Sequence, residues 1–196
     1  MITTETIKAL RDQTGVSVMQ CKKALEEAGG DMDKALLVLR KMSSAQAEKK
    51  ADRTLGAGLV HSYIHSNKKV GVLLEINCET DFVAQNEAFV GLATDIALHI
   101  AAMSPEFVSK EQIPAAEQDR IKAFFADEIA NVEKPEEIKA KILEGKIADY
   151  FKEKTLLDQP FVKNPELTIH QLIDGVVQKT GEKVEVGRFV RYTVLG

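Results

Sequence analysis

Cysteine is scarce in this sequence, since Cys21 and Cys78 are the only two among 196 residues. They form no CxxC pair, and the chain opens with polar residues such as Glu5 and Lys8 rather than with the basic and apolar stretches of a secretion signal. We therefore expect two free thiols in a reducing compartment and no structural disulfide.

Long apolar runs and an excess of positive charge are also missing. No stretch of about 18 consecutive apolar residues occurs, so we expect no membrane partner and a soluble, cytoplasmic protein. The net charge of −4 argues against a partner bound through its phosphates, so no direct nucleic-acid contact is predicted. Hydrophobic residues make up 44% of the chain, which is enough for a sizeable core in one or two domains.

Side chains that could carry chemistry are present, but not at the spacing that an enzyme needs. His61 and His65 are four residues apart on a predicted strand, a separation of about 13 Å that one metal ion does not bridge. The segment GVVQKTGEK from Gly175 has the wrong glycine spacing for a phosphate-binding loop. No catalytic residue, metal site or cofactor is therefore predicted. A small hydrolase that uses Glu75 and Glu79 is an alternative.

The first 41 residues predict three short helices. The first ends at Gly15, Ser17 and Gln20 form a capping pair that opens the second, and Asp31 caps the third. The apolar stripe of the second helix consists of Val18, Cys21, Leu25 and Ala28. Residues 43–58 lack such a stripe, so we expect a polar, partly helical linker there and a first domain of residues 1–54.

The period of the pattern then changes from helical to alternating. Residues 59–65 and 70–79 predict a β-hairpin, and the apolar stripe after the N-cap Asn86 predicts a helix over 87–103 that covers it. A helix around 168–180 precedes a third strand. That strand is predicted from the alternation of Val184, Val186, Val190, Tyr192 and Val194, as if all shared one face. The prediction is an α+β core with a small antiparallel sheet packed by helices.

All five prolines lie between residues 105 and 165, in a region with two helical stretches. These stretches cover roughly residues 117–132 and 136–154, and Gly145 interrupts the second. Their many charged residues need solvent, so we expect a helical hairpin that leaves the core over about residues 115–158. Two ordinary surface helices are the alternative. The second domain is then residues 55–196.

Three motifs resemble the elongation factor Ts family. They are LRDQTGVSVMQCKKALEEAGGDMDKA at residues 10–35, VGVLLEINCETDFVAQN at 70–86 and QPFV at 159–162. The resemblance implies a three-helix module similar to ubiquitin-associated domains, a core, and a coiled-coil excursion. It also implies a guanine-nucleotide exchange factor, not an enzyme, whose partner is elongation factor Tu in its GDP-bound and nucleotide-free forms.

The resemblance further implies which residues bind the partner. Asp81 and Phe82, completed by Val83 and Ala84, are expected to disturb the magnesium and phosphate site of elongation factor Tu and so promote GDP release. Other contacts are implied for Arg11, Val18, Met19, His65 and Gly181. Thr180 and Lys183 depart from the family pattern, which puts the contact at Gly181 in question.

Two further expectations concern assembly and an alternative role. Longer relatives carry two core copies where this chain has one, so we expect two chains to pair through their sheets. Val190 stands where some short relatives have a cysteine, so this homodimer would be non-covalent. The alternative role is a ubiquitin-associated-like adaptor that binds a protein partner through residues 1–41 without exchange activity.

Overall fold

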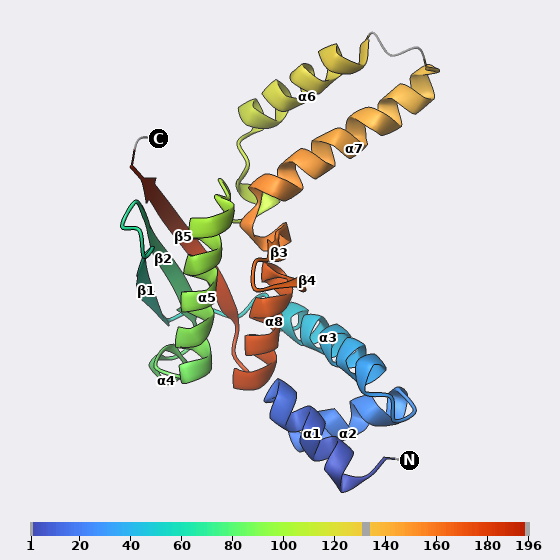
Figure 1. Ribbon diagram of the computed structural model, residues 1–196, viewed down its shortest axis with the longest axis vertical. Helices are drawn as coiled ribbons and strands as arrows, with labels where there is room; N and C mark the ends of the chain where they lie inside the picture. The colour runs from blue at the N-terminus through green and yellow to red at the C-terminus, as the bar shows by residue number, and fades with distance from the viewer. Residues whose placement is uncertain (1, 131–133, 195–196) are drawn as a thin grey trace.

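The computed structural model describes residues 2–130 and 134–194, and its three parts follow one another along the longest axis (Figure 1). A helical module lies at one end, a sheet covered by helices lies in the middle, and a helical hairpin extends from the other end. This arrangement confirms the predicted α+β class. Within the described residues, no helix is both long and apolar enough to cross a bilayer.

The N-terminal module contains the three predicted helices. They are α1 (Thr4–Thr14), α2 (Val18–Glu27) and α3 (Met32–Glu48). The side chains of Thr3, Ser17 and Asp31 accept a backbone N–H at the start of each helix. The prediction that Val18 belongs to the buried stripe of the second helix is wrong. Val18 is the first residue of α2 and is exposed, whereas Val16, just before the helix, fills that place in the core.

Helix α3 continues to Glu48, into the segment that was predicted to be a polar linker. Its second half lies along α8 (Ile169–Thr180), and Ser43 is buried there, with its single hydroxyl proton shared between two acceptors, the carbonyl of Leu39 and Gln178 Oε1. Ala47 packs against the main core. The first part of the predicted linker is therefore a packed helix that joins the module to the core.

The central sheet has the order β1-β2-β5 and is antiparallel throughout. Its strands are β1 (Ala57–Ile64), β2 (Val70–Cys78) and β5 (Val184–Thr193). Helix α5 (Glu87–Met103), capped by Asn86 as predicted, covers one face of the sheet together with α8 (Figure 1). The core between them is filled by apolar residues from all five elements, such as Leu74, Ile76, Phe89, Ile96, Val177 and Val186.

A β-bulge corrects the prediction for the third strand. Glu75 pairs with Arg188, but the next residue of β2, Ile76, pairs with Val186, so Gly187 is an extra residue in β5. The bulge shifts the alternation by one. Val184 and Val186 face the core as predicted, whereas Val190, Tyr192 and Val194 are exposed on the opposite, outer face.

Two long helices form the helical hairpin. Its helices are α6 (Ala115–Ala130) and α7 (Glu136–Lys154). The predicted interruption at Gly145 is absent, because α7 continues through that residue. The last residues predicted for the first of these helices lie outside the described residues. Near the core the two helices close on a small apolar cluster that includes Ile113, Ile121 and Phe151. The hairpin therefore has its own packing and projects away from the sheet (Figure 1).

The short elements on either side of the helical hairpin were not predicted. They are the 3₁₀ turns η1 (Lys110–Gln112), just before α6, and η2 (Leu156–Asp158), with the two-stranded sheet of β3 (Pro160–Phe161) and β4 (Asn164–Thr168). The QPFV motif lies here. His99 Nε2 lies 2.8 Å from Gln159 Oε1, and the backbone N–H of Val162 donates to His99 Nδ1 at 3.2 Å. Since Nδ1 accepts, the proton of the neutral ring is on Nε2.

Candidate interaction surface

The segment between the β-hairpin of β1 and β2 and helix α5 is a single helical turn, α4 (Asp81–Ala84). Thr80 is its N-cap, and its hydroxyl accepts the N–H of Val83 at 3.4 Å. Successive residues of a helix point about 100° apart, so a four-residue turn faces all directions. Val83 (3% exposed) lies in the core, whereas Phe82 is 81% exposed.

The four residues implied by the resemblance therefore divide into two pairs. Asp81 and Phe82 are exposed at the surface, where a partner could contact them. Val83 and Ala84 belong to the core cluster, so their side chains support the turn from inside. An exposed phenylalanine leaves apolar area in water, which association with a partner would remove.

The loop at Gly181 lies beside α4, although the two are about a hundred residues apart in sequence. Gly181 ends α8 with φ +78, a left-handed conformation that favours glycine, and its carbonyl accepts a hydrogen bond from Lys50 Nζ. The next residue, Glu182, accepts hydrogen bonds from Thr80. The backbone N–H of Lys183 donates to Glu79, and this bond lowers the pKa of the Glu79 carboxyl.

Three other expected contacts lie on the N-terminal module. Arg11 is exposed at the end of α1, and Val18 and Met19 are exposed at the start of α2, Met19 at 77%. The turn between these helices approaches α8 so closely that a Cβ on Gly15 would lie 3.2 Å from Lys179 Cε. In Figure 1, α1, α2 and α4 lie toward the same end of the molecule, on either side of the last turn of α8.

His65 is not brought to this region. It follows β1 at the turn of the β-hairpin, next to the pair formed by Ile64 and Gly71. Helix α4 lies at the opposite end of this hairpin, after the last residue of β2. With about 3.3 Å per strand residue, roughly 25 Å separates the two ends of the hairpin. The ring of His65 bonds through Nδ1 to the hydroxyl of Tyr63 at 3.0 Å. Any contact at His65 would therefore involve a different part of a partner.

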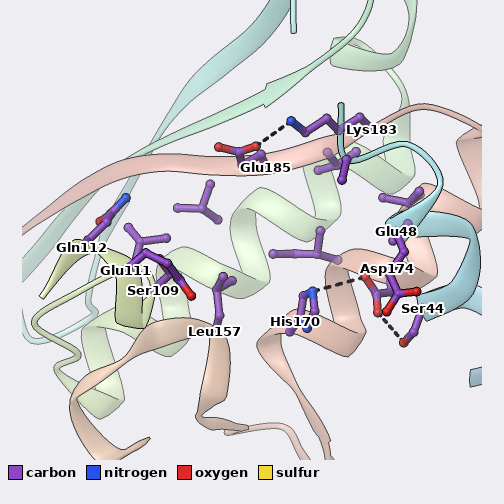
Figure 2. Close-up of a pocket in the computed structure, with 17 residues that line it drawn as sticks. Ser44, Glu48, Ser109, Glu111, Gln112, Leu157, His170, Asp174, Lys183 and Glu185 are labelled. Carbon is purple, nitrogen blue, oxygen red and sulfur yellow. Dashed lines mark hydrogen bonds and ion pairs between the residues drawn. The ribbon is translucent and has the colours of Figure 1, made fainter. Parts of the chain in front are cut away.

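A cavity of about 380 Å³ between α3, α8 and β5 contains a serine, a histidine and an aspartate (Figure 2). Asp174, 2% exposed, accepts the hydroxyl hydrogen bond of Ser44 at 2.6 Å, and His170 Nε2 lies 3.7 Å from its other oxygen. In a nucleophilic triad the histidine stands between the serine and the acid. Here the aspartate stands in the middle, so the arrangement links α3 to α8 and lacks a base positioned on the serine.

The cavity includes none of the expected partner-binding residues. Among the described residues, no group of three or more histidine, cysteine or acidic side chains is arranged to hold a metal ion. The acidic residues of the β2 end are also occupied, because Glu75 pairs with Arg188 and Glu79 with Arg53. The arrangement around α4 suits association with a macromolecule better than chemistry on a small substrate.

Sequence reasoning missed two features of the protein surface, one beside α4 and one on the sheet. The first is the pair of carboxylates, Glu79 and Glu182, that join α4 to the loop after α8; the pairing spans too much sequence for a local pattern to reveal. The second is an apolar patch on the outer face of the sheet, here called the outer-face patch. It consists of Val60, Ile64, Leu73, Val190, Tyr192 and Val194.

The fold and this surface are typical of a protein-binding factor, with an exposed aromatic on a turn that hydrogen bonds and core packing hold in place. Comparison with known proteins gives the family. A family model described as Elongation factor TS matches residues 37–195.

Similar proteins cover almost the whole chain. Elongation factor Ts of Desulforamulus reducens is 50% identical over 97% of this chain and 88% of its own length. That of Thermosipho melanesiensis is 46% identical over 99% of both chains. That of Coprothermobacter proteolyticus is 47% identical over 98% of both. The chain therefore belongs to the elongation factor Ts family and is a translation elongation factor.

Proposed function

We propose that this protein is the guanine-nucleotide exchange factor of elongation factor Tu and that Phe82 is the side chain that enters the partner. The observation that carries the proposal is the 81% exposure of Phe82 on a turn whose next two residues, Val83 and Ala84, are anchored in the core. Buried aromatic anchors dominate the energy of protein interfaces, and truncating one costs about 2 to 4 kcal/mol. Asp81, beside it, is exposed as well.

The mechanism requires no chemical step by this chain. Insertion of Phe82 near the magnesium and phosphate site of the partner would favour a partner state with weak nucleotide affinity. Linkage makes this antagonism reciprocal: if the factor weakened GDP binding about a thousandfold, GDP would weaken the factor by the same roughly 4 kcal/mol. The complex is therefore transient when nucleotide is present. This role places the protein in the cytoplasm, with a protein rather than nucleic acid or membrane as partner.

The test is release of labelled GDP from elongation factor Tu, measured with and without this protein. We expect the release rate to increase with the concentration of the factor and to saturate. An unchanged release rate at saturating factor would disprove the proposed exchange activity. If residues 1–41 alone bound the partner as tightly as the full chain, the adaptor role would be favoured instead.

We also propose that two copies pair non-covalently through the outer-face patch. Six apolar side chains are exposed together there, five on three adjacent strands and Val194 just after β5, and contiguous exposed apolar residues mark interaction sites. A second copy offers the same chemistry, and a two-fold axis lets one patch cover the other. Both cysteines are buried, and burial raises the pKa of the Cys78 thiol, so no thiol is placed to link the copies.

A further inference from the structure

We propose that Glu182 is a positioning residue that holds the Phe82 turn in the orientation needed for exchange; the proposal rests on the function inferred above. The carboxylate accepts two hydrogen bonds from one residue. The backbone N–H of Thr80 donates to Oε2 at 3.0 Å, and the Thr80 hydroxyl donates to Oε1 at 2.7 Å. Both bonds have an ionised acceptor, so they are stronger than bonds between neutral groups.

Fixing Thr80 fixes the start of α4. The Thr80 hydroxyl donates a hydrogen bond to Glu182 and accepts one from the backbone N–H of Val83. The backbone carbonyl of Thr80 accepts the N–H of Ala84 at 3.1 Å. A helix of one turn is not stable by itself, because the cost of nucleation is not recovered over so few residues. The orientation of α4 is therefore set by the core packing of Val83 and Ala84 together with the hydrogen bonds that hold its first residues.

A second carboxylate holds the same junction from the opposite side. Glu79 accepts the backbone N–H of Lys183 at 2.6 Å and pairs with Arg53 at 3.1 Å. Each of the two segments thus supplies a carboxylate to a backbone N–H of the other. The bond from Lys183 lowers the pKa of the Glu79 carboxyl, so this acceptor stays ionised to a lower pH than an ordinary glutamate.

The hydrogen bonds that Glu79 and Glu182 make between the start of α4 and the loop after α8, here called the brace, also connect α4 to the N-terminal module. Glu182 follows Gly181, whose carbonyl bonds to Lys50, and the last turn of α8 contacts the module at Gly15 through Lys179. A displacement of this loop would therefore move the Phe82 turn relative to Arg11 and the start of α2. Holding the exposed ring in one place beforehand reduces the entropy that binding has to overcome.

The first test is Glu182→Gln, which keeps the size of the side chain but loses its charge and one of its acceptor oxygens. We expect the concentration of factor that half-saturates GDP release to rise about tenfold. In the free protein, the backbone amides of Val83 and Ala84 should exchange with solvent faster. The matched control is Asp95→Asn, which removes a carboxylate that bonds to Lys163 at 2.7 Å on another part of the core.

A merely structural role is distinguished by combining Glu182→Gln with Phe82→Ala. If Glu182 acts through the ring, the double variant exchanges nucleotide no worse than Phe82→Ala alone. Additive losses, or a Glu182→Gln variant that behaves like Asp95→Asn in both measurements, would overturn the proposal. Absence of stimulation by the unmodified protein would instead refute the exchange function, and the amide measurement still tests the brace independently.

Discussion

At the scale of single residues, two aromatic rings of this chain have opposite environments. Phe82 is exposed on a supported turn, whereas His99 is fully buried and bonds through both ring nitrogens. The fold gains little from Phe82 and depends on His99. Substitutions at the two positions should therefore separate partner binding from stability.

We expect Phe82→Ala to slow stimulated GDP release by a factor of about 30 or more, because the variant loses the anchor of the interface. Its free energy of unfolding should change by less than about 0.5 kcal/mol, as for other exposed positions. Val72→Ala, at a buried position of β2 far from α4, is the control: it should lower stability by about 2 kcal/mol through lost burial and a cavity, while exchange per folded molecule remains close to normal. Unfolding of Phe82→Ala with normal exchange would identify Phe82 as a core residue.

His99 makes stability depend on pH. Burial lowers the pKa of His99 below its ordinary value of 6.5, although the hydrogen bond to Gln159 partly opposes this. Below pH 6.5 the unfolded chain binds a proton that the folded chain does not, so stability contributed by the neutral ring is present above 6.5 and lost as the pH falls below it.

We therefore expect the free energy of unfolding to fall between pH 6.5 and 5, by at most about 1.4 kcal/mol per pH unit from this group. Urea titrations over that range measure it. His99→Gln, which cannot titrate, should be less stable at neutral pH and show a flatter dependence. His65→Gln removes an exposed imidazole and serves as the control. An unchanged slope in His99→Gln would show that other groups cause the dependence.

At the scale of elements, the contact between α3 and α8 connects the module to the core. It is built from polar side chains: Ser43 bonds to Gln178 and Ser44 to Asp174, while Arg40 pairs with Glu166 of β4. Buried polar groups cost free energy unless they are paired, so this interface depends on its register more than an apolar one would. The contacts expected at Arg11, Val18 and Met19 depend in turn on how the module is held.

Ser44→Ala tests this interface. The substitution removes the hydrogen bond to Asp174 and leaves a buried carboxylate with only His170 nearby, which should cost about 1 to 3 kcal/mol of stability. We expect a lower thermal midpoint and faster amide exchange along α3. Ser66→Ala, in the exposed turn of the hairpin, is the control and should leave both unchanged. A Ser44→Ala protein as stable as that control would show that the bond contributes nothing.

At the scale of the whole molecule, the outer-face patch is the surface through which we propose that two copies pair. The bulge at Gly187 creates this patch by turning the second half of β5 outward. The position suits a glycine, because a Cβ there would lie 2.7 Å from Glu75 Oε1 and 2.8 Å from Asn77 Nδ2. The same bulge thus shapes both faces of the sheet.

We expect sedimentation across a dilution series to show a concentration-dependent dimer that reductant does not alter. Tyr192→Glu should abolish it, because a carboxylate would then be buried without a partner. Phe124→Glu, on an exposed apolar residue of α6, is the matched control and should dimerise normally. A strict monomer at tens of micromolar that still drives full exchange would show that one core copy is enough.

Local patterns predicted the elements well because their causes lie close together in sequence. Helix α5 was predicted to the residue, since its N-cap Asn86 and its apolar stripe lie within one continuous segment. The hairpin followed from alternation on either side of a polar turn, and the motifs at residues 10–35 and 70–86 indicated the family that comparison then confirmed. The bounds of α3 were less accurate, because its polar second half is held by α8.

The sequence by itself determined most of the longer helices and strands, the fold class and the family of this protein. Only the tertiary structure decided which side chains face outward: Phe82 and not Val83, Tyr192 and not Val186, and Glu182 bonded to Thr80 across 102 positions of chain. These outcomes depend on the free energy of contacts between segments far apart in sequence. A bulge opposite Ile76 or a carboxylate brought to an N-cap exists only once the partner strand or loop is in place, so no local period contains it.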